Sequence, residues 1–143
     1  MKKISIACMI LCLTGAISLL FRSSVLANSW PAVSVQVFAC ILLLWGRLTL
    51  GRRGFHSSAE PTEGGIIDKG PYRYLRHPMY VSLLYFFWAG FFCHPSIINL
   101  GLVVGVTAGL FIRMWQEEHL ITQKYPEYNV YAKKAKIILP FII

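Results

Sequence analysis

MYVSLLYFFWAGFFC, residues 79–93, is followed after a single residue, His94, by PSIINLGLVVGVTAGLFI, residues 95–112. Neither run contains a charged residue. A helix needs about 20 apolar residues to cross the hydrocarbon core of a bilayer, so the second run is close to a full span and the first is short. Because so little chain separates the two runs, we expect them to form a tight helical hairpin in a membrane.

Two further apolar runs come earlier in the chain. Residues 4–21 contain no charge, and residues 30–50 contain one, Arg47, near their end. With the hairpin, they predict an all-α integral membrane protein with about four transmembrane helices. We expect one membrane domain over residues 1–143, made of two spans (1–50), a loop (51–78), the hairpin (79–112) and a C-terminal segment with a short cytoplasmic helix (113–143).

The composition supports this interpretation and excludes others. Of the 143 residues, 56% are hydrophobic and 14% are charged, whereas about 25% of the residues of a soluble domain are charged. The hydrophobicity also excludes a disordered chain. The four cysteines lie within apolar runs and lack metal-ligand spacing, so we expect reduced thiols and no metal. The net charge is +8, but no basic face on a soluble module indicates nucleic-acid binding.

The basic residues indicate how the chain is oriented. They lie before the first run, between the second and third, and after the fourth, whereas the other two connections hold only Arg22. Cytoplasmic connections are enriched in lysine and arginine, so we expect both termini and the 51–78 loop to be cytoplasmic and to meet anionic membrane lipids. The first run also resembles part of a signal peptide ending near Ala27, but its length favours a retained helix.

The stretch GPYRYLRHPMY, residues 70–80, contains the first group of candidate site residues. Pro78 suits the first turn of a helix, where its missing N–H has no partner, and this makes His77 the expected N-cap. The unpaired N–H groups and partial positive charge at such a helix start attract an anionic group such as a carboxylate. The alternative is an interfacial belt, with tyrosines at headgroup depth and Arg73 and Arg76 on lipid phosphates.

A second group follows the fourth apolar run and consists of Arg113, Glu117, Glu118 and His119. It holds two of the six acidic residues of the chain. Arg113 and Glu117 are four residues apart and share a helix face, whereas Glu118 points about 100° away. The alternative is an ordinary ion pair at the membrane surface, and the sequence leaves open which glutamate faces a ligand.

The expected hairpin places both groups at the same cytoplasmic level, about one helix diameter apart. The first group is cationic and aromatic, and the second provides carboxylates. An amino-acid zwitterion needs both kinds of partner, a carboxylate satisfies ribose hydroxyls, and aromatic walls suit an adenine. The two groups together therefore suit a cofactor with an amino-acid end and a nucleoside end.

These motifs resemble a known family. GPYRYLRHPMY, followed about 40 residues later by EEHLITQKYPEYNVYAKKAKIILP at residues 117–140, is similar to the isoprenylcysteine carboxyl methyltransferase family, whose wider group includes membrane phospholipid methyltransferases. The resemblance covers residues 64–140. The chain departs from the family at Pro126, where a glycine is common, and at Lys136, near which an arginine often precedes the final proline.

The resemblance implies S-adenosylmethionine as the methyl donor and suggests which residues hold it. Arg113 corresponds to an arginine beside the methyl acceptor, which gives it a catalytic and substrate-binding role. The implied cofactor-binding residues are Gly64, Gly65, Ile66, Ile67, Tyr72, His77, Pro78, Met79, Tyr80 and Glu117.

The chemistry favours a carboxylate on a hydrophobic or isoprenoid-linked molecule as the acceptor. A carboxylate nucleophile has no proton to lose and needs no general base, and Arg113, which stays protonated, can orient it with paired N–H donors. One alternative is methylation of a lipid amine, which must first lose a proton. Another is a non-catalytic membrane binding partner.

Overall fold

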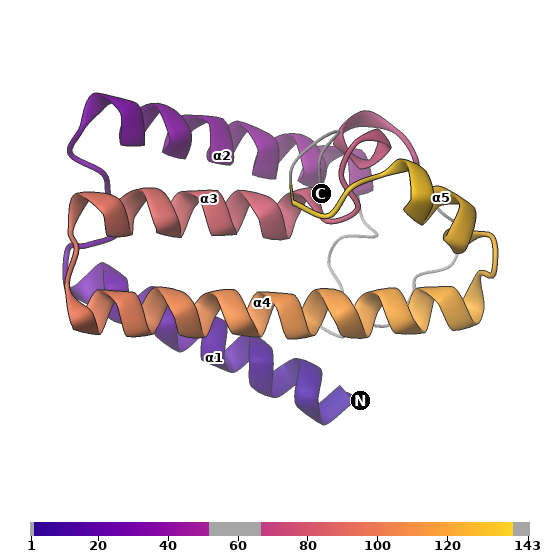
Figure 1. Cartoon of the computed structure of the whole chain (residues 1–143), viewed down its shortest axis with the longest axis horizontal. Helices are drawn as coiled ribbons and strands as arrows, with labels where there is room; N and C mark the ends of the chain where they lie inside the picture. Colours follow the sequence, from indigo (N-terminus) through magenta and orange to yellow (C-terminus); the bar gives the residue numbers. More distant parts are fainter. Residues whose placement is uncertain (1, 52–66, 139–143) are drawn as a thin grey trace.

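The computed structural model of the chain describes residues 2–51 and 67–138 (Figure 1). Its longer helices are α1 (Lys2–Phe21), α2 (Trp30–Leu50), α3 (Pro78–Cys93) and α4 (Ile97–Lys124). A short 3-10 helix, η2 (Gly70–Arg73), precedes α3, and a short helix, α5 (Tyr128–Lys134), follows α4. Within the described ranges, the one β-type pairing is an isolated parallel bridge between Leu75 and Lys136. The all-α prediction is therefore confirmed for this part of the chain.

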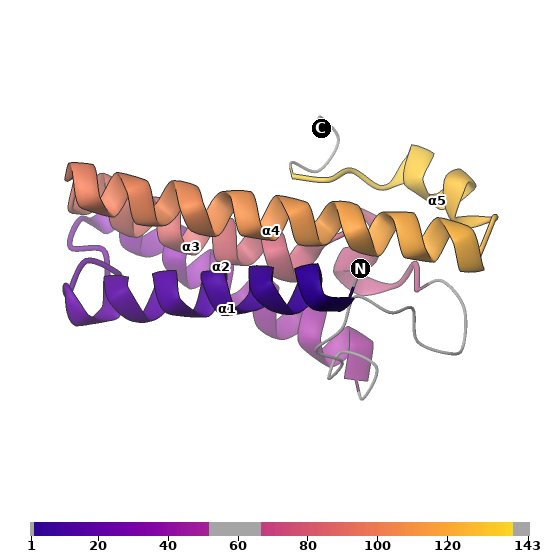
Figure 2. The ribbon, with the colours of Figure 1, turned by 90° about the horizontal axis from the view of Figure 1, so that it is seen from below.

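The four long helices run alternately up and down, side by side (Figures 1 and 2). Residues 94–96 join α3 to α4, so the expected hairpin is present, and the Ser96 side chain caps α4 by accepting a hydrogen bond of 3.1 Å from the Asn99 N–H. The packing is less simple than a hairpin, because α3 packs mainly against α2 and α4 packs mainly against α1. The bundle therefore consists of two helix pairs that meet along α3 and α4.

The lengths and exposed faces of the helices suit a lipid environment. Two helices, α2 and α4, are long and apolar enough to cross a membrane, whereas the apolar helices Met9–Phe21 and Pro78–Cys93 are shorter. Large apolar side chains such as Leu48, Ile98 and Phe92 are more than half exposed, and a soluble surface rarely tolerates such wide apolar faces. Two of the four expected spans therefore have the length and composition that a transmembrane helix needs. The count of four spans remains a prediction.

A buried amide fastens the end of the bundle that lies away from α5. Gln36 of α2 donates from Nε2 to the carbonyl oxygens of Val25, at 2.6 Å, and Phe86, at 3.1 Å, and its Oε1 accepts from the Ala27 N–H at 2.9 Å. A buried polar side chain is tolerated when its donors and acceptors are satisfied. Gln36 therefore ties the connection between α1 and α2 to both α2 and α3.

The same connection crosses α3 where only glycine leaves room. A Cβ added to Gly90 would collide with the Val25 carbonyl oxygen, which belongs to the backbone and cannot rotate away. By contrast, nothing lies within 4 Å of a Cβ added to Gly101 on α4.

We predict that Gly90→Ala destabilises the protein by about 1–3 kcal/mol, the usual effect of overpacking. Gly101→Ala is the matched control and should leave stability unchanged or raise it slightly, since alanine is the better helix former. Thermal unfolding in detergent measures both variants. Equal melting temperatures for the wild type and Gly90→Ala would contradict the close approach.

Candidate functional site

The turn before α3 is pressed against the end of α2. Gly70 has a φ of +56°, a left-handed conformation that glycine adopts without strain. A Cβ at this position would lie 3.2 Å from Trp45 Nε1 and still closer to the Thr49 hydroxyl, so a side chain would push η2 away from α2. This contact sets where residues 71–77 approach the start of α3.

His77 occupies the N-cap of α3 with Pro78 in the first turn, as the sequence predicts. Its side chain makes no capping hydrogen bond and lies elsewhere, only 6% exposed, between two carboxylates. Nδ1 lies 3.8 Å from Glu117 Oε2, and Nε2 lies 3.2 Å from Glu118 Oε1. The tautomer that carries its proton on Nε2 makes the shorter contact a hydrogen bond. The start of α3 is thereby joined to the end of α4.

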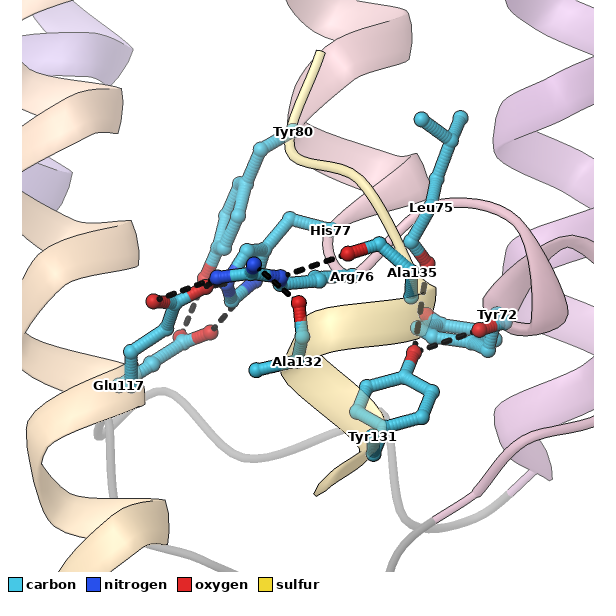
Figure 3. A network of polar contacts seen from close by, with 10 residues as sticks. Tyr72, Leu75, Arg76, His77, Tyr80, Glu117, Tyr131, Ala132 and Ala135 are labelled. Carbon is cyan, nitrogen blue, oxygen red and sulfur yellow. Dashed lines mark hydrogen bonds and ion pairs between the residues drawn. The ribbon is translucent and has the colours of Figure 1, made fainter. Parts of the chain in front are cut away.

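Three side chains form a second set of contacts between α3 and α4. Tyr80 lies about one turn after His77 in α3, and Arg113 lies about one turn before Glu117 in α4. Arg113 Nε donates to Tyr80 Oη at 2.7 Å and lies 3.4 Å from Glu117 Oε1. Tyr80 in turn donates its hydroxyl proton to Glu117 (Figure 3). Arg113 and Glu117 therefore share a helix face, as their spacing predicts, and Tyr80 of α3 joins them.

Arg76 extends this arrangement on the side of Glu118. Its Nη1 donates to the two Glu118 oxygens at 3.2 and 3.3 Å. The result is a charge cluster of two guanidinium groups, two carboxylates and an imidazole: Arg76, His77, Arg113, Glu117 and Glu118.

The formal charges of this cluster balance, and its members are largely withdrawn from water. The Arg113 side chain is 9% exposed, and the two glutamate side chains are 21% and 26% exposed. Burying ion pairs seldom adds stability, because desolvation offsets their attraction. Buried, mutually perturbed charges are instead common at functional sites, and this cluster offers partners for both charges of a zwitterion.

The remaining candidate residues differ in their placement. Pro78 is buried and Met79 half-buried beside Gly46 of α2. Tyr72 is half-buried, and burial raises the pKa of its hydroxyl, so that it stays protonated at neutral pH. Figure 3 shows it on the far side of Arg76 from Glu117. Ile67 is half-buried at the edge of the described part, and Gly64, Gly65 and Ile66 lie outside the described residues.

His119 does not join the cluster. It is exposed, its ring stacks on Trp115 with an interplanar angle of 13°, and its Nε2 lies 3.0 Å from Gln123 Nε2. Of the four residues grouped together in the sequence, His119 therefore lies on the surface, apart from Arg113 and the two glutamates.

Sequence reasoning missed two residues near the cluster. The sequence indicates no partner for Arg76 within the chain, and a lipid contact is one of its two alternatives; in the structure its guanidinium binds Glu118. Gln116 is 2% exposed, and its Oε1 has no hydrogen-bond partner among the described residues. Its position three residues after Arg113 was the available signal, because i and i+3 residues are neighbours on a helix.

Fold and site together define a helical membrane protein with a buried charge cluster at one end of its bundle. The family profile described as phospholipid methyltransferase matches residues 27–128, well over half of the chain, and the chain belongs to this family. The family is part of the isoprenylcysteine carboxyl methyltransferase-like group, and membership implies a membrane methyltransferase. No curated protein and no solved structure shows significant similarity to the chain.

We predict that His77→Ala lowers the stability of the protein by about 1–3 kcal/mol, because it removes the partner that the two carboxylates share. His119→Ala is the control: it removes an exposed imidazole and should change stability by less than about 0.5 kcal/mol. Thermal unfolding in detergent at neutral pH compares the two. A melting temperature of His77→Ala equal to that of the wild type would show that the imidazole of His77 does not hold the cluster together.

Proposed function

We propose that this protein is an S-adenosylmethionine-dependent methyltransferase that esterifies a carboxylate on a hydrophobic or isoprenoid-linked acceptor. The observation that carries the proposal is the position of Arg113, held by Tyr80 and Glu117 in direct continuity with His77. A permanently charged guanidinium, which can bind an anion, thus lies beside the residues that the family resemblance connects with the cofactor.

The chemistry of the described residues fits the cofactor. Carboxylates such as Glu117 suit its ammonium and sulfonium charges and its ribose hydroxyls. The first N–H groups of α3 have no partners within the helix and suit its carboxylate. The unpartnered Oε1 of Gln116 can accept a hydrogen bond from an N–H group of a ligand. His77, Pro78, Met79, Tyr80 and Glu117 would hold the cofactor, with Tyr72 and residues 64–67 completing the site.

When bound, the cofactor supplies a methyl group that its sulfonium has already activated. The protein then needs to orient two reactants and keep water away from them. Arg113 cannot serve as a base because it stays protonated, but it can hold an acceptor carboxylate through its N–H donors. Contacts of its Nε with Tyr80 and Glu117 fix the plane of the guanidinium. The exposed apolar helix faces would let the acceptor keep its hydrocarbon chain in the bilayer.

We also propose that the protein is multi-pass, with four spans, and that both termini and the site are cytoplasmic. The start of α1, the end of α4 and α5 lie at the same end of the bundle as the charge cluster (Figure 1). Exposed basic side chains gather near that end: Lys69, Arg73, Lys133 and Lys134. Their excess on one side of a membrane protein favours the cytoplasmic side.

The second candidate function is N-methylation of a phospholipid amine, which the description of the matched family favours. Such an acceptor must give up a proton before it attacks a methyl group. A neighbouring Arg113 disfavours an ammonium acceptor by charge repulsion, whereas the two glutamates could attract it. The two candidates therefore differ in the charge of the group that binds beside Arg113.

Transfer of a radiolabelled methyl group in detergent distinguishes the two acceptors. We expect the purified protein to label a prenylated cysteine analogue and not phosphatidylethanolamine. An alkali-labile product identifies a methyl ester. Labelling of the amine lipid alone would reject the carboxylate acceptor, and no labelling of either, with intact protein, would count against both.

We predict that Glu117→Ala weakens the affinity for the demethylated cofactor, S-adenosylhomocysteine, about tenfold, which corresponds to about 1.4 kcal/mol. Arg113→Ala should keep that affinity within about threefold and lower turnover about 100-fold or more, the usual loss when one charge-stabilising donor is removed. Calorimetry and methyl transfer at saturating cofactor measure the two effects. Variants with unchanged affinity and turnover would remove both assignments.

A further inference from the structure

Arg76 makes several hydrogen bonds that the proposed reaction does not use. Its Nε donates to the Ala135 carbonyl oxygen at 2.8 Å, and its Nη2 donates to the Ala132 carbonyl oxygen. Both carbonyls lie at the end of α5, where helical carbonyls lack partners within the helix. The remaining nitrogen, Nη1, binds Glu118. One guanidinium of the charge cluster thus contacts the C-terminal part of the chain (Figure 3) and Glu118 at the same time.

The backbone around Arg76 holds the same C-terminal part. The Arg76 N–H donates to the Lys136 carbonyl oxygen at 2.8 Å, and the Lys136 N–H donates to the Tyr74 carbonyl oxygen at 2.9 Å. We call residues 131–138 the C-terminal strap. Two tyrosines fasten it further: Tyr131 donates to the Tyr72 carbonyl oxygen, and Tyr85 of α3 donates to the Ile138 carbonyl oxygen at 2.9 Å.

Through Glu118, the contacts of Arg76 reach the imidazole of His77. Glu118 Oε1 lies 3.2 Å from Arg76 Nη1 and 3.2 Å from His77 Nε2. If the strap leaves Arg76, the guanidinium loses two acceptors and is free to move. Glu118 then loses one of the two partners that hold its carboxylate, and the imidazole, which is the other partner, is oriented less firmly.

We propose that Arg76 is a positioning residue that couples docking of the C-terminal strap to the cofactor-binding geometry of His77. The proposal rests on the proposed function, because it assumes that His77 and Glu117 hold the cofactor. Arg76 acts through Glu118 and touches no reacting group. Linkage then requires the effect to be reciprocal, so that a bound cofactor holds the strap closed.

The test compares Arg76→Gln with Arg73→Gln in the full-length protein. Arg73 is exposed and lies in the same segment, so its replacement removes the same charge without touching the cluster. We expect Arg76→Gln to weaken S-adenosylhomocysteine binding by about tenfold or more, as loss of a group that orients a ligand-holding residue commonly does. Arg73→Gln should stay within about twofold of the wild type.

Hydrogen exchange of the strap amides provides the readout of coupling. Saturating S-adenosylhomocysteine should slow exchange over residues 131–138 in the wild type and in Arg73→Gln, but not in Arg76→Gln. Arg76→Lys keeps the charge but cannot reach the two carbonyls and the carboxylate together, so it should restore affinity only in part. This variant also keeps the proposal testable if Arg76→Gln fails to fold.

Kinetics distinguish positioning from a general structural role. We expect Arg76→Lys to raise the KM for the cofactor and to leave kcat within about threefold, since the contacts of Arg113 are untouched. Wild-type protein that binds no S-adenosylhomocysteine would contradict the proposed function itself. Wild-type protein that binds it, together with Arg76 variants that bind it equally well, would overturn only the role of Arg76.

Discussion

The contact of His77 with Glu117 and Glu118 is the interaction on which the site depends. Because α3 packs mainly on α2, and α4 mainly on α1, few backbone contacts join the two helix pairs. At the end that carries α5, the charge cluster supplies the connection between them. At the other end, the short connection 94–96 serves the same purpose. The hydrogen bond from Arg22 Nε to Asn99 Oδ1, at 2.9 Å, instead joins the end of α1 to α4 within one pair.

This division of the bundle supports the proposal that a ligand binds at the charge cluster. Apolar packing between α3 and α4 lies around Leu84, Val106 and Leu110 and, nearer the 94–96 connection, around Val103. Both groups lie between the charge cluster and that connection. At the level of the cluster the contacts between α3 and α4 are polar and include ion pairs and the hydroxyl of Tyr80. An ion pair can exchange one partner for another at a small net change in free energy, since desolvation opposes the attraction in either arrangement. A zwitterionic cofactor offers the cluster replacement charges of both signs.

The positions of the helices follow from the order of apolar and polar residues along the chain, whereas the way the helices pair does not. The apolar runs predict four long helices, and Pro78 places His77 at the start of α3, because both depend on neighbouring residues alone. The pairing of α3 with α2 is not visible in the sequence, since apolar faces carry no information about their partner.

The sequence likewise predicted only part of the candidate site. Arg113 and Glu117 were found because a four-residue spacing fixes their relation on one helix. Arg76 was missed because its acceptors are backbone carbonyls of a segment 56 and 59 residues away, and backbone groups have no sequence signature. Tyr72, which the family resemblance includes, lies beyond Arg76, and residues 64–66 fall outside the described part of the chain.

A double-mutant cycle tests whether the start of α3 and the end of α4 form one site. Calorimetry measures S-adenosylhomocysteine binding to the wild type, His77→Ala, Glu117→Ala and the double variant. If both side chains act on the same ligand in mutual contact, the two substitutions should be non-additive by about 1 kcal/mol or more. Additive effects, or an affinity that neither substitution changes, would contradict a shared site.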